Sequence, residues 1–321
     1  MIVPRILWVL LFLSILYPML QSQEAIDGSF PFQDDPEKKY AIYVPSNYDE
    51  SNANSLMVGL HPLNINRWNA VSWRDTLIQF AEMNDLLLIC PDGGDDGKID
   101  DPIDTAFTSL IIDSMEIWYN IDPSKKYLMG FSWGGKTTYT YGLRRINQFA
   151  GFMPIGAAIS GIAEIEDVIN QAQNKSFFVI HGSNDSPNAR YFPIIAGLEE
   201  QGACVLTNYL NGVGHTIDFE DRDIILTEAY EQLANSNCGM TATATIEDKA
   251  EISVFATSDP LKFRIESEDA WQLLHIIGKD GKSVDFKLDG SIVELNSSVR
   301  GMILFAFQQE GTIISKKLIL F

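Results

Sequence analysis

The chain has 321 residues, and its 43 acidic side chains against 23 basic ones give a formal net charge of −20. This charge excludes a protein that binds nucleic acid through its phosphates, because such a protein needs a basic face that releases counterions. Hydrophobic residues make up 46% of the chain and charged residues 21%, as in globular proteins with a sizeable core. At this length we expect one large domain, or one large and one small domain.

The first 22 residues are typical of a secretory signal peptide. Arg5 is followed by a mostly apolar stretch from Ile6 to Leu20, after which the chain turns polar. This stretch is short for a membrane span, which needs about 20 apolar residues. We therefore expect residues 1–22 to send the protein out of the cell or to its surface. The alternative is an uncleaved membrane anchor.

From Lys39 to about Leu210, short β-forming segments alternate with segments of helical periodicity. This alternation predicts a mostly parallel sheet with helices on both faces. The predicted strands are 40–44, 56–61, 86–90, 127–130, 152–159, 177–181 and 205–210. The predicted helices are 72–83, 106–119, 133–146, 188–201 and 219–235.

Three cysteines are too few and too widely spaced for a disulfide framework or a zinc cluster. At most one bridge can form among Cys90, Cys204 and Cys238. Because Cys90 follows one apolar segment and Cys204 lies within another, we expect both to be buried thiols.

We place the α/β domain at residues 23–240, and the sequence pattern changes after it. Residues 241–251 have no helical period and are expected to be a linker. Residues 252–321 then show alternating segments separated by turn signals at Asp280-Gly281 and Asp289-Gly290. This pattern predicts a small C-terminal antiparallel β-sandwich domain.

Residues 130–135 read Gly-Phe-Ser-Trp-Gly-Gly and contain a G-x-S-x-G motif between a predicted strand and a predicted helix. In that context a tight turn lifts the serine Oγ above the sheet edge, while the glycines keep side chains away. The helix N-terminus also favours negative charge beside the serine. We therefore predict that Ser132 is a nucleophile.

A serine nucleophile needs a histidine base. The chain has four histidines. His215 lies in a glycine-rich segment between the last strand and the last helix of the α/β segment, from which it can reach back to the serine. We choose it over His61, His181 and His275.

The histidine in turn needs an acid that fixes the tautomer of its ring. Asp185 follows the predicted strand 177–181 after a short polar loop, and it lies between the other two residues in the chain. The order Ser132, Asp185, His215 is that of α/β-hydrolases, not that of trypsin-like or subtilisin-like proteases. Asp218 is closer to the histidine in sequence, but we assign it to the start of the next helix.

Two N–H donors are needed for the oxyanion that forms during acyl transfer. The first is predicted to be the backbone N–H of Trp133, the residue after the nucleophile. The second is expected from the loop after strand 56–61. Because Pro62 has no N–H, Leu63 is the first choice, and Asn64 is the next. We also assign Asn64 to substrate binding.

Tryptophans near these segments are candidates for a platform that binds a sugar or an aromatic group. They are Trp68, Trp73 and Trp133, of which we assign Trp68 to substrate binding; the alternative is that they belong to the core. Only about 16 residues separate Ser160 from Phe177, too few for an inserted lid. We therefore expect an open site that suits acyl groups carried on a bulky polymer.

The acidic segment Asp92–Asp104 is a candidate calcium loop of the EF-hand type. If Gly97 is aligned with the glycine of such a loop, Gly94 and Ile103 fall at positions that need oxygen ligands from their side chains. The calcium motif therefore fails, and we expect a solvated loop at the rim of the site. The residue pattern predicts no metal site and no cofactor.

Five segments in family order resemble the secreted α/β-hydrolase esterases grouped with polyhydroxybutyrate depolymerases, feruloyl esterases and acetylxylan esterases. These segments are Leu60-His61-Pro62, Cys90-Pro91-Asp92-Gly93, Ile121-Asp122-Pro123, Gly130-Phe131-Ser132-Trp133-Gly134-Gly135 and Gly214-His215. The chain departs from the family at Pro62, where the family usually has glycine, and it lacks the Cys-x-Gln that often follows.

Residues 252–321 are similar to the C-terminal sorting domains of the type IX secretion system of Gram-negative bacteria. The similarity lies in the Lys279-Asp280-Gly281-Lys282 turn between two strands and in the closing hairpin from Gly301 to Leu320. The Tyr-Pro-Asn-Pro usual near the start is replaced by Phe255-Ala256-Thr257-Ser258. The alternative is a carbohydrate-binding or immunoglobulin-like module.

Together these resemblances imply a secreted serine esterase without cofactor or metal, whose C-terminal domain is recognised by the secretion machinery. The expected substrates are feruloyl or acetyl esters on plant or algal polysaccharide. The alternatives are a depolymerase of polyhydroxyalkanoate-type polyesters and a non-catalytic secreted glycan-binding or adhesion protein built on a hydrolase fold.

Overall fold

The computed structural model describes residues 23–63, 66–100, 102–236 and 238, together with the C-terminal segments 253–257, 259, 261–267, 271–278, 284–296, 301–309 and 312–320. The expected signal peptide, the linker 241–251 and the Asp280-Gly281 turn lie outside the described residues. Among the helices that are described, none combines the length and the apolar character needed to cross a membrane.

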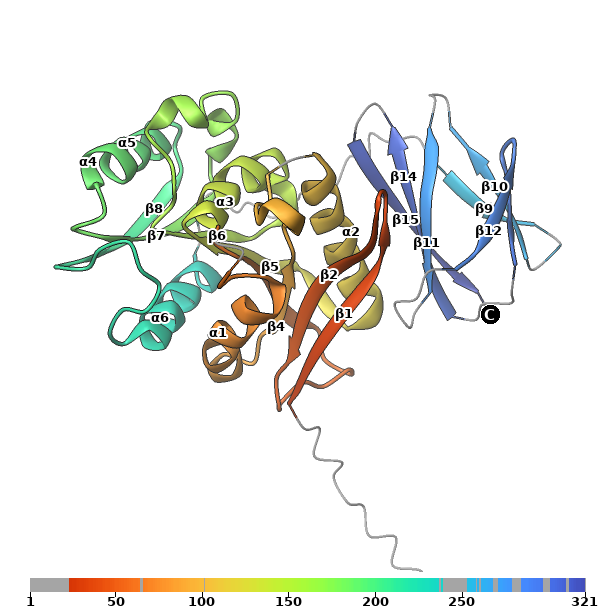
Figure 1. Cartoon of the computed structure of the whole chain (residues 1–321), viewed down its shortest axis with the longest axis horizontal. Helices are drawn as coiled ribbons and strands as arrows, with labels where there is room; N and C mark the ends of the chain where they lie inside the picture. Colours follow the sequence, from red (N-terminus) through yellow and green to blue (C-terminus); the bar gives the residue numbers. More distant parts are fainter. Residues whose placement is uncertain are drawn as a thin grey trace, which may run out of the picture.

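A mostly parallel sheet forms the centre of the larger domain. In chain order its strands are β1 (Glu24–Phe32), β2 (Asp35–Val44), β3 (Asn54–Leu60), β4 (Leu87–Pro91), β5 (Ile121–Phe131), β6 (Gly151–Ile155), β7 (Ser176–Gly182) and β8 (Cys204–Leu210). Across the sheet they follow the order β1-β2-β4-β3-β5-β6-β7-β8 (Figure 1). The pairs β1–β2 and β2–β4 are antiparallel, and the remaining neighbours in this sheet are parallel.

Helices cover both faces of this sheet, as the sequence predicts. They are α1 (Ala70–Met83), α2 (Pro102–Trp118), α3 (Trp133–Arg144), α4 (Pro187–Arg190), α5 (Phe192–Glu200) and α6 (Arg222–Ala234), with short 3₁₀ helices η1 (Gly94–Asp96), η2 (Ile146–Gln148), η3 (Ile162–Glu164) and η4 (Ile169–Ala172). Residues of α1 and α6 form one hydrophobic cluster, and residues of α2, α3 and α5 form the other. Figure 1 shows α1 and α6 on one side of the sheet and α3 and α5 on the other.

The strand sequences explain this three-layer arrangement. In β3, Val58 and Leu60 belong to the cluster with α2 and α3, whereas Met57 belongs to the cluster with α1. Successive side chains of a strand point to opposite faces, so a strand covered on both faces is apolar throughout. The central strands are therefore held by the hydrophobic effect on both sides.

Three elements differ from the sequence-based expectation. The hairpin of β1 and β2 begins at Glu24, before the first predicted strand. Residues 188–201 form two helices, because Pro193, in the first turn of α5, has no N–H and its ring excludes a continuous helix. The strand expected at 152–159 ends at Ile155, directly before Gly156, whose φ of +45° is unsuitable for most residues.

A disulfide joins Cys204, at the start of β8, to Cys238, which follows α6. The expected buried thiol is confirmed for Cys90, which is free and fully buried. It is wrong for Cys204, because β8 is the edge strand of the sheet and the residue is exposed there. The apolar neighbours of Cys204 in sequence are themselves partly exposed.

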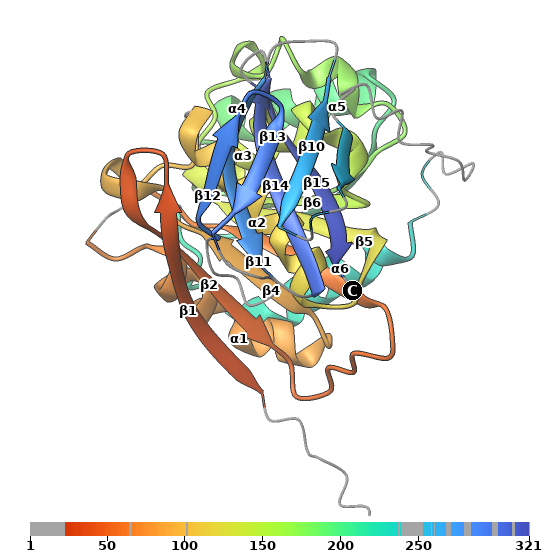
Figure 2. The ribbon, with the colours of Figure 1, turned by 90° about the vertical axis from the view of Figure 1, so that its right-hand side faces the viewer.

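The described C-terminal segments form two antiparallel sheets. Their strands are β9 (Ser253–Ala256), β10 (Lys262–Glu266), β11 (Gln272–Gly278), β12 (Phe286–Asp289), β13 (Ile292–Leu295), β14 (Gly301–Gln309) and β15 (Thr312–Leu320). One sheet has the order β12-β13-β10-β9 and the other β11-β14-β15 (Figure 2). Side chains of both sheets share one hydrophobic cluster. The predicted turn at Asp289-Gly290 joins β12 to β13, and β14 and β15 contact α2.

Candidate active site

Ser132 lies at the sharp turn between β5 and α3. Its backbone has φ of 57° and ψ of −113°, a combination that is rare for a residue with a side chain. Hydrogen bonds hold it there: its N–H donates to the Ile155 carbonyl at 3.0 Å, and its carbonyl accepts from the Ala158 N–H at 2.7 Å. The neighbouring strand β6 and the segment after it therefore fix the backbone of the serine.

The glycines of the motif are required by close backbone contacts. A Cβ on Gly134 would lie 2.0 Å from the Leu60 carbonyl oxygen, and one on Gly130 would lie 2.3 Å from the Gly134 carbonyl oxygen. Both distances are far below van der Waals contact. The turn after β5 can thus approach the end of β3 only when these positions lack side chains.

The structure brings Ser132, His215 and Asp185 together in one hydrogen-bonded chain. Ser132 Oγ lies 2.7 Å from His215 Nε2, and His215 Nδ1 lies 2.7 Å from Asp185 Oδ2. Because a carboxylate only accepts, we assign the ring proton to Nδ1, which leaves Nε2 as the acceptor for the serine hydroxyl. Asp185 is only 5% exposed, whereas the His215 side chain is 37% exposed and Ser132 is half-buried.

The loops that carry the acid and the histidine are bonded to each other. The Asn184 N–H donates to the Val213 carbonyl at 2.8 Å, and the Gly212 N–H donates to Ser183 Oγ at 2.8 Å. A Cβ on Gly182 would lie 2.4 Å from the Val213 carbonyl oxygen, so glycine allows this approach. Asp185 and His215 are therefore placed by a single paired-loop unit at the ends of β7 and β8.

Two further residues contact this chain and were not among the predicted site residues. The ring of Phe131 packs on the imidazole of His215, with centroids 4.9 Å apart and planes tilted by 31°. Arg190 Nη1 donates to Asp185 Oδ1 at 2.9 Å. Phe131 could have been found from the sequence as the variable residue before the serine in the G-x-S-x-G motif. For Arg190 the sequence signal is a basic residue five positions after the predicted acid.

The two other histidines of the α/β part have different partners. His61 is buried, donates from Nδ1 to the Pro62 carbonyl at 3.1 Å and accepts at Nε2 from the Gly93 N–H at 2.9 Å. Buried His181 donates from Nε2 to the Asp185 carbonyl at 2.9 Å. Burial lowers the pKa of both rings, so both are neutral structural groups. His275 lies on β11, in the C-terminal sheets.

The four residues expected to bind the oxyanion and the substrate lie in different places. Trp133 is the first residue of α3, where a backbone N–H has no partner within the helix. Leu63, in the loop after β3, is 40% exposed. Asn64 lies outside the described residues. Trp68 is 7% exposed and packs edge-on against the fully buried Trp73, 5.5 Å between centroids, so both side chains take part in core packing.

The indole of Trp133 remains the accessible one of the three candidate tryptophans. It is half-buried, and its Nε1 donates to Asp100 Oδ2 at 3.0 Å. The ammonium groups of Lys98 and Lys136 lie 5.2 and 4.9 Å from the ring centroid, within cation–π range. The acidic loop before α2 therefore contacts the residue beside Ser132, which agrees with its expected place at the rim.

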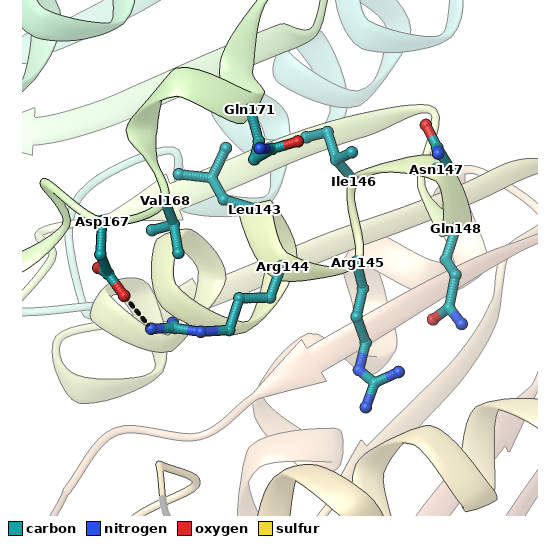
Figure 3. Close-up of a pocket in the computed structure, with 9 residues that line it drawn as sticks. All are labelled: Leu143, Arg144, Arg145, Ile146, Asn147, Gln148, Asp167, Val168 and Gln171. Atoms are coloured by element: carbon teal, nitrogen blue, oxygen red, sulfur yellow. Dashed lines mark hydrogen bonds and ion pairs between the residues drawn. The ribbon is translucent and has the colours of Figure 1, made fainter. Parts of the chain in front are cut away.

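A cavity of about 620 Å³ lies away from these residues, at the C-terminal end of α3 (Figure 3). It is lined by Arg144, Arg145 and Gln148 among others, and Arg144 forms an exposed ion pair with Asp167. The 12 residues of α3 span about 18 Å, so this cavity is at the opposite end of the helix from Ser132.

Curated relatives match the α/β part of the chain. The probable feruloyl esterase C of Aspergillus niger is 29% identical over 155 residues, which are 46% of this chain and 55% of that protein. The bifunctional acetylxylan esterase/xylanase XynS20E of Neocallimastix patriciarum is 30% identical over 151 residues, 45% of this chain and 21% of that protein. The chain thus spans about half the length of the feruloyl esterases that it matches. No family model matches it.

Solved structures share the fold at low sequence identity. FphF, a fluorophosphonate-binding serine hydrolase of Staphylococcus aureus, aligns with a TM-score of 0.56 and 11% identity over 67% of this chain and 99% of its own. A ferulic acid esterase aligns with a TM-score of 0.54 and 16% identity over 66% of this chain and 98% of its own. These likenesses confirm the predicted α/β-hydrolase fold.

Proposed function

We propose that the protein is a serine esterase that hydrolyses carboxylic esters, with Ser132 as nucleophile, His215 as base and Asp185 as the acid that orients the base. The observation that carries this proposal is the continuous hydrogen-bonded chain from Ser132 Oγ through the imidazole to Asp185 Oδ2. The curated relatives, which are named as feruloyl and acetylxylan esterases, support the same reaction class.

Acylation follows from this geometry. His215 Nε2 takes the hydroxyl proton as Ser132 Oγ bonds to the ester carbon, and the imidazolium is stabilised by the buried Asp185 carboxylate. The C–O bond to the alcohol then breaks as Nε2 returns the proton to the leaving oxygen. Water attacks the acyl-enzyme by the same route and releases the acid, which restores the serine hydroxyl.

We assign the stabilisation of the negative charge on the tetrahedral intermediate to two backbone donors, the N–H groups of Trp133 and Leu63. The first is at the N-terminus of α3, where the helix dipole adds to its effect. Loss of one such donor typically raises the barrier by about 3 kcal/mol.

We propose feruloyl or acetyl esters on plant or algal polysaccharide as the substrates. The half-exposed Ser132 and His215 support access by a bulky polymer, and the names of the curated relatives support these acyl groups. The indole of Trp133 at the rim offers a surface for an aromatic acyl group or a sugar. A depolymerase of polyhydroxyalkanoate-type polyesters is the alternative substrate assignment.

The test is the hydrolysis of 4-nitrophenyl acetate, 4-nitrophenyl butyrate and methyl ferulate by the wild type and by Ser132→Ala. We expect turnover that the Ser132→Ala variant loses without a change in melting temperature, with the preferred acyl group ranking the substrate classes. Labelling by a fluorophosphonate probe should depend on Ser132. Absence of both turnover and labelling would instead favour a non-catalytic glycan-binding or adhesion protein.

We also propose that the protein acts outside the cell or at its surface, and that the C-terminal β-sandwich is the part recognised by the type IX secretion machinery. The Cys204–Cys238 disulfide supports an oxidising compartment. The test is to produce the full chain and a chain ending at residue 240 in a bacterium with this machinery. Equal export of both would refute the sorting role.

A further inference from the structure

We propose that Arg190 is a positioning residue, which holds the Asp185 carboxylate in the orientation that His215 requires. The proposal rests on the esterase function above and adds a fourth residue to its hydrogen-bonded chain. Arg190 was not among the residues predicted from the sequence, and its guanidinium contacts the acid, not the serine.

Each oxygen of the Asp185 carboxylate has its own donor. Oδ1 accepts from Arg190 Nη1 at 2.9 Å, and Oδ2 accepts from His215 Nδ1 at 2.7 Å. The torsion that rotates a carboxylate is broad in aspartate, so the Asp185 backbone does not fix the angle at which the carboxylate faces the imidazole. With one oxygen held by a charged donor, the other is directed to the imidazole.

The remaining contacts of Asp185 hold its backbone and do not hold its carboxylate. Its carbonyl accepts from His181 Nε2 at 2.9 Å, and its N–H donates to the Gly182 carbonyl at 3.0 Å. His181 Nε2 is 3.9 Å from Oδ2, beyond hydrogen-bond distance. Among the described residues, the side chains that donate to this carboxylate are therefore those of Arg190 and His215.

The short helix α4 places the arginine. Ser186 has φ of 51° and precedes Pro187, so the chain turns directly after the acid, and the Arg190 N–H donates to the Ser186 carbonyl at 3.1 Å. One helical turn thus returns Arg190 over Asp185. Its side chain is 30% exposed, which leaves space for a small cation from solvent when the side chain is removed.

The guanidinium also lies close to the imidazole. Arg190 Nη1 lies 3.4 Å from His215 Nδ1, and both nitrogens donate to the same carboxylate. A guanidinium has no acceptor, so Nδ1 could bond to Arg190 only by accepting, and it instead donates to Asp185 Oδ2 at the shorter distance of 2.7 Å. The carboxylate that Arg190 orients therefore selects the tautomer that leaves Nε2 free to accept the serine proton.

The experiment compares Arg190→Ala and Arg190→Lys with the wild type, using 4-nitrophenyl acetate and the full chain. We expect kcat of Arg190→Ala to fall about tenfold with KM unchanged, the effect of losing one charge-assisted hydrogen bond. The kcat of Arg190→Lys should lie between those of Arg190→Ala and the wild type. Millimolar guanidinium should raise kcat of Arg190→Ala and leave that of the other proteins unchanged. Arg144→Ala, at the exposed pair with Asp167, is the matched control and should behave as wild type.

A second readout does not depend on turnover. The Nδ1 proton of His215 should give a low-field proton NMR signal in the wild type, which weakens or shifts in Arg190→Ala and persists in Arg144→Ala. If the wild type shows this signal but no serine-dependent hydrolysis, the esterase proposal fails while the positioning role stands. The positioning role would be overturned if both the low-field signal and kcat were unchanged in Arg190→Ala. A loss of activity that tracks a lower melting temperature and that guanidinium does not restore would also overturn it.

Discussion

At the scale of single residues, the site depends on positions where a side chain is absent as much as on those where one is present. The backbone of Ser132 is held in a left-handed conformation, and it approaches the end of β3 through Gly134. The pattern of small residues around the serine predicts such a turn, because only glycine fits there. No such sequence pattern marks Arg190, because its hydrogen bond to Asp185 depends on how α4 folds back over the acid.

Gly134→Ala should destabilise the protein and reduce hydrolysis. The added Cβ would lie 2.0 Å from the Leu60 carbonyl oxygen, and overpacking of this kind typically costs about 2 kcal/mol. Urea unfolding measures the loss. Gly214→Ala, whose Cβ would meet no atom within 4 Å, is the control for stability. Equal stability of the two variants would contradict the prediction.

The neutral histidines predict that stability falls as the pH drops below about 6.5. Burial lowers the pKa of His61 and His181 in the folded state, whereas the unfolded chain protonates both near 6.5. The unfolded state then binds more protons, so the free energy of unfolding decreases from pH 7 toward pH 5. This window lies above the range of the carboxylates Glu82 and Glu164, whose pKa values are lowered.

Urea unfolding at pH 8, 7, 6 and 5.5 measures this slope. His181→Gln should reduce it, because the amide can donate to the Asp185 carbonyl but does not titrate. A free energy of unfolding that rises as the pH falls through this window would contradict the assignment of neutral rings.

At the scale of elements, the alternation of apolar and helical segments was sufficient to predict the parallel strands and the helices on both faces. It could not predict that β8 is an edge strand, because its sequence is as apolar as that of a buried strand. The pairing of Cys204 with Cys238 follows from this position, since an exposed edge lets the segment after α6 approach. Tertiary context, and not local propensity, decided these features.

Loss of the disulfide should lower the free energy of unfolding by about 4 kcal/mol, the loop-entropy estimate for its sequence separation of 34 residues. Urea unfolding of the wild type with and without a reductant measures the change. A Cys204→Ser, Cys238→Ser double variant should match the reduced wild type and should not respond to reductant. Burial raises the pKa of the Cys90 thiol, so this thiol should stay unreactive in the native state.

At the scale of the whole molecule, every residue of the proposed triad lies before Cys238, and the C-terminal β-sandwich has its own hydrophobic cluster. The described contacts between the two parts join α2 to β14 and β15. The acidic excess of the chain is a property of the sequence as a whole, and it predicts no binding to nucleic acid through phosphates, which requires a basic face.

A chain ending at residue 240 should therefore hydrolyse 4-nitrophenyl acetate with the kcat/KM of the full chain. It retains the three residues of the proposed triad, Arg190 and the disulfide. Parallel assays of the two chains measure this, with thermal unfolding as a check that the shorter chain is folded. A large loss of kcat/KM in a folded short chain would show that the sandwich contributes to the reaction.

The paired loops after β7 and β8 have a mechanical consequence. The acid and the base are bonded to each other at the edge of the sheet, whereas the serine stands on a turn anchored to its centre. A displacement of that edge therefore carries Asp185 and His215 together and changes the contacts of His215 with Phe131 and with Ser132 Oγ. The contact across which the proton must move, between Nε2 and Oγ, thus joins a loop at the edge of the sheet to a turn at its centre.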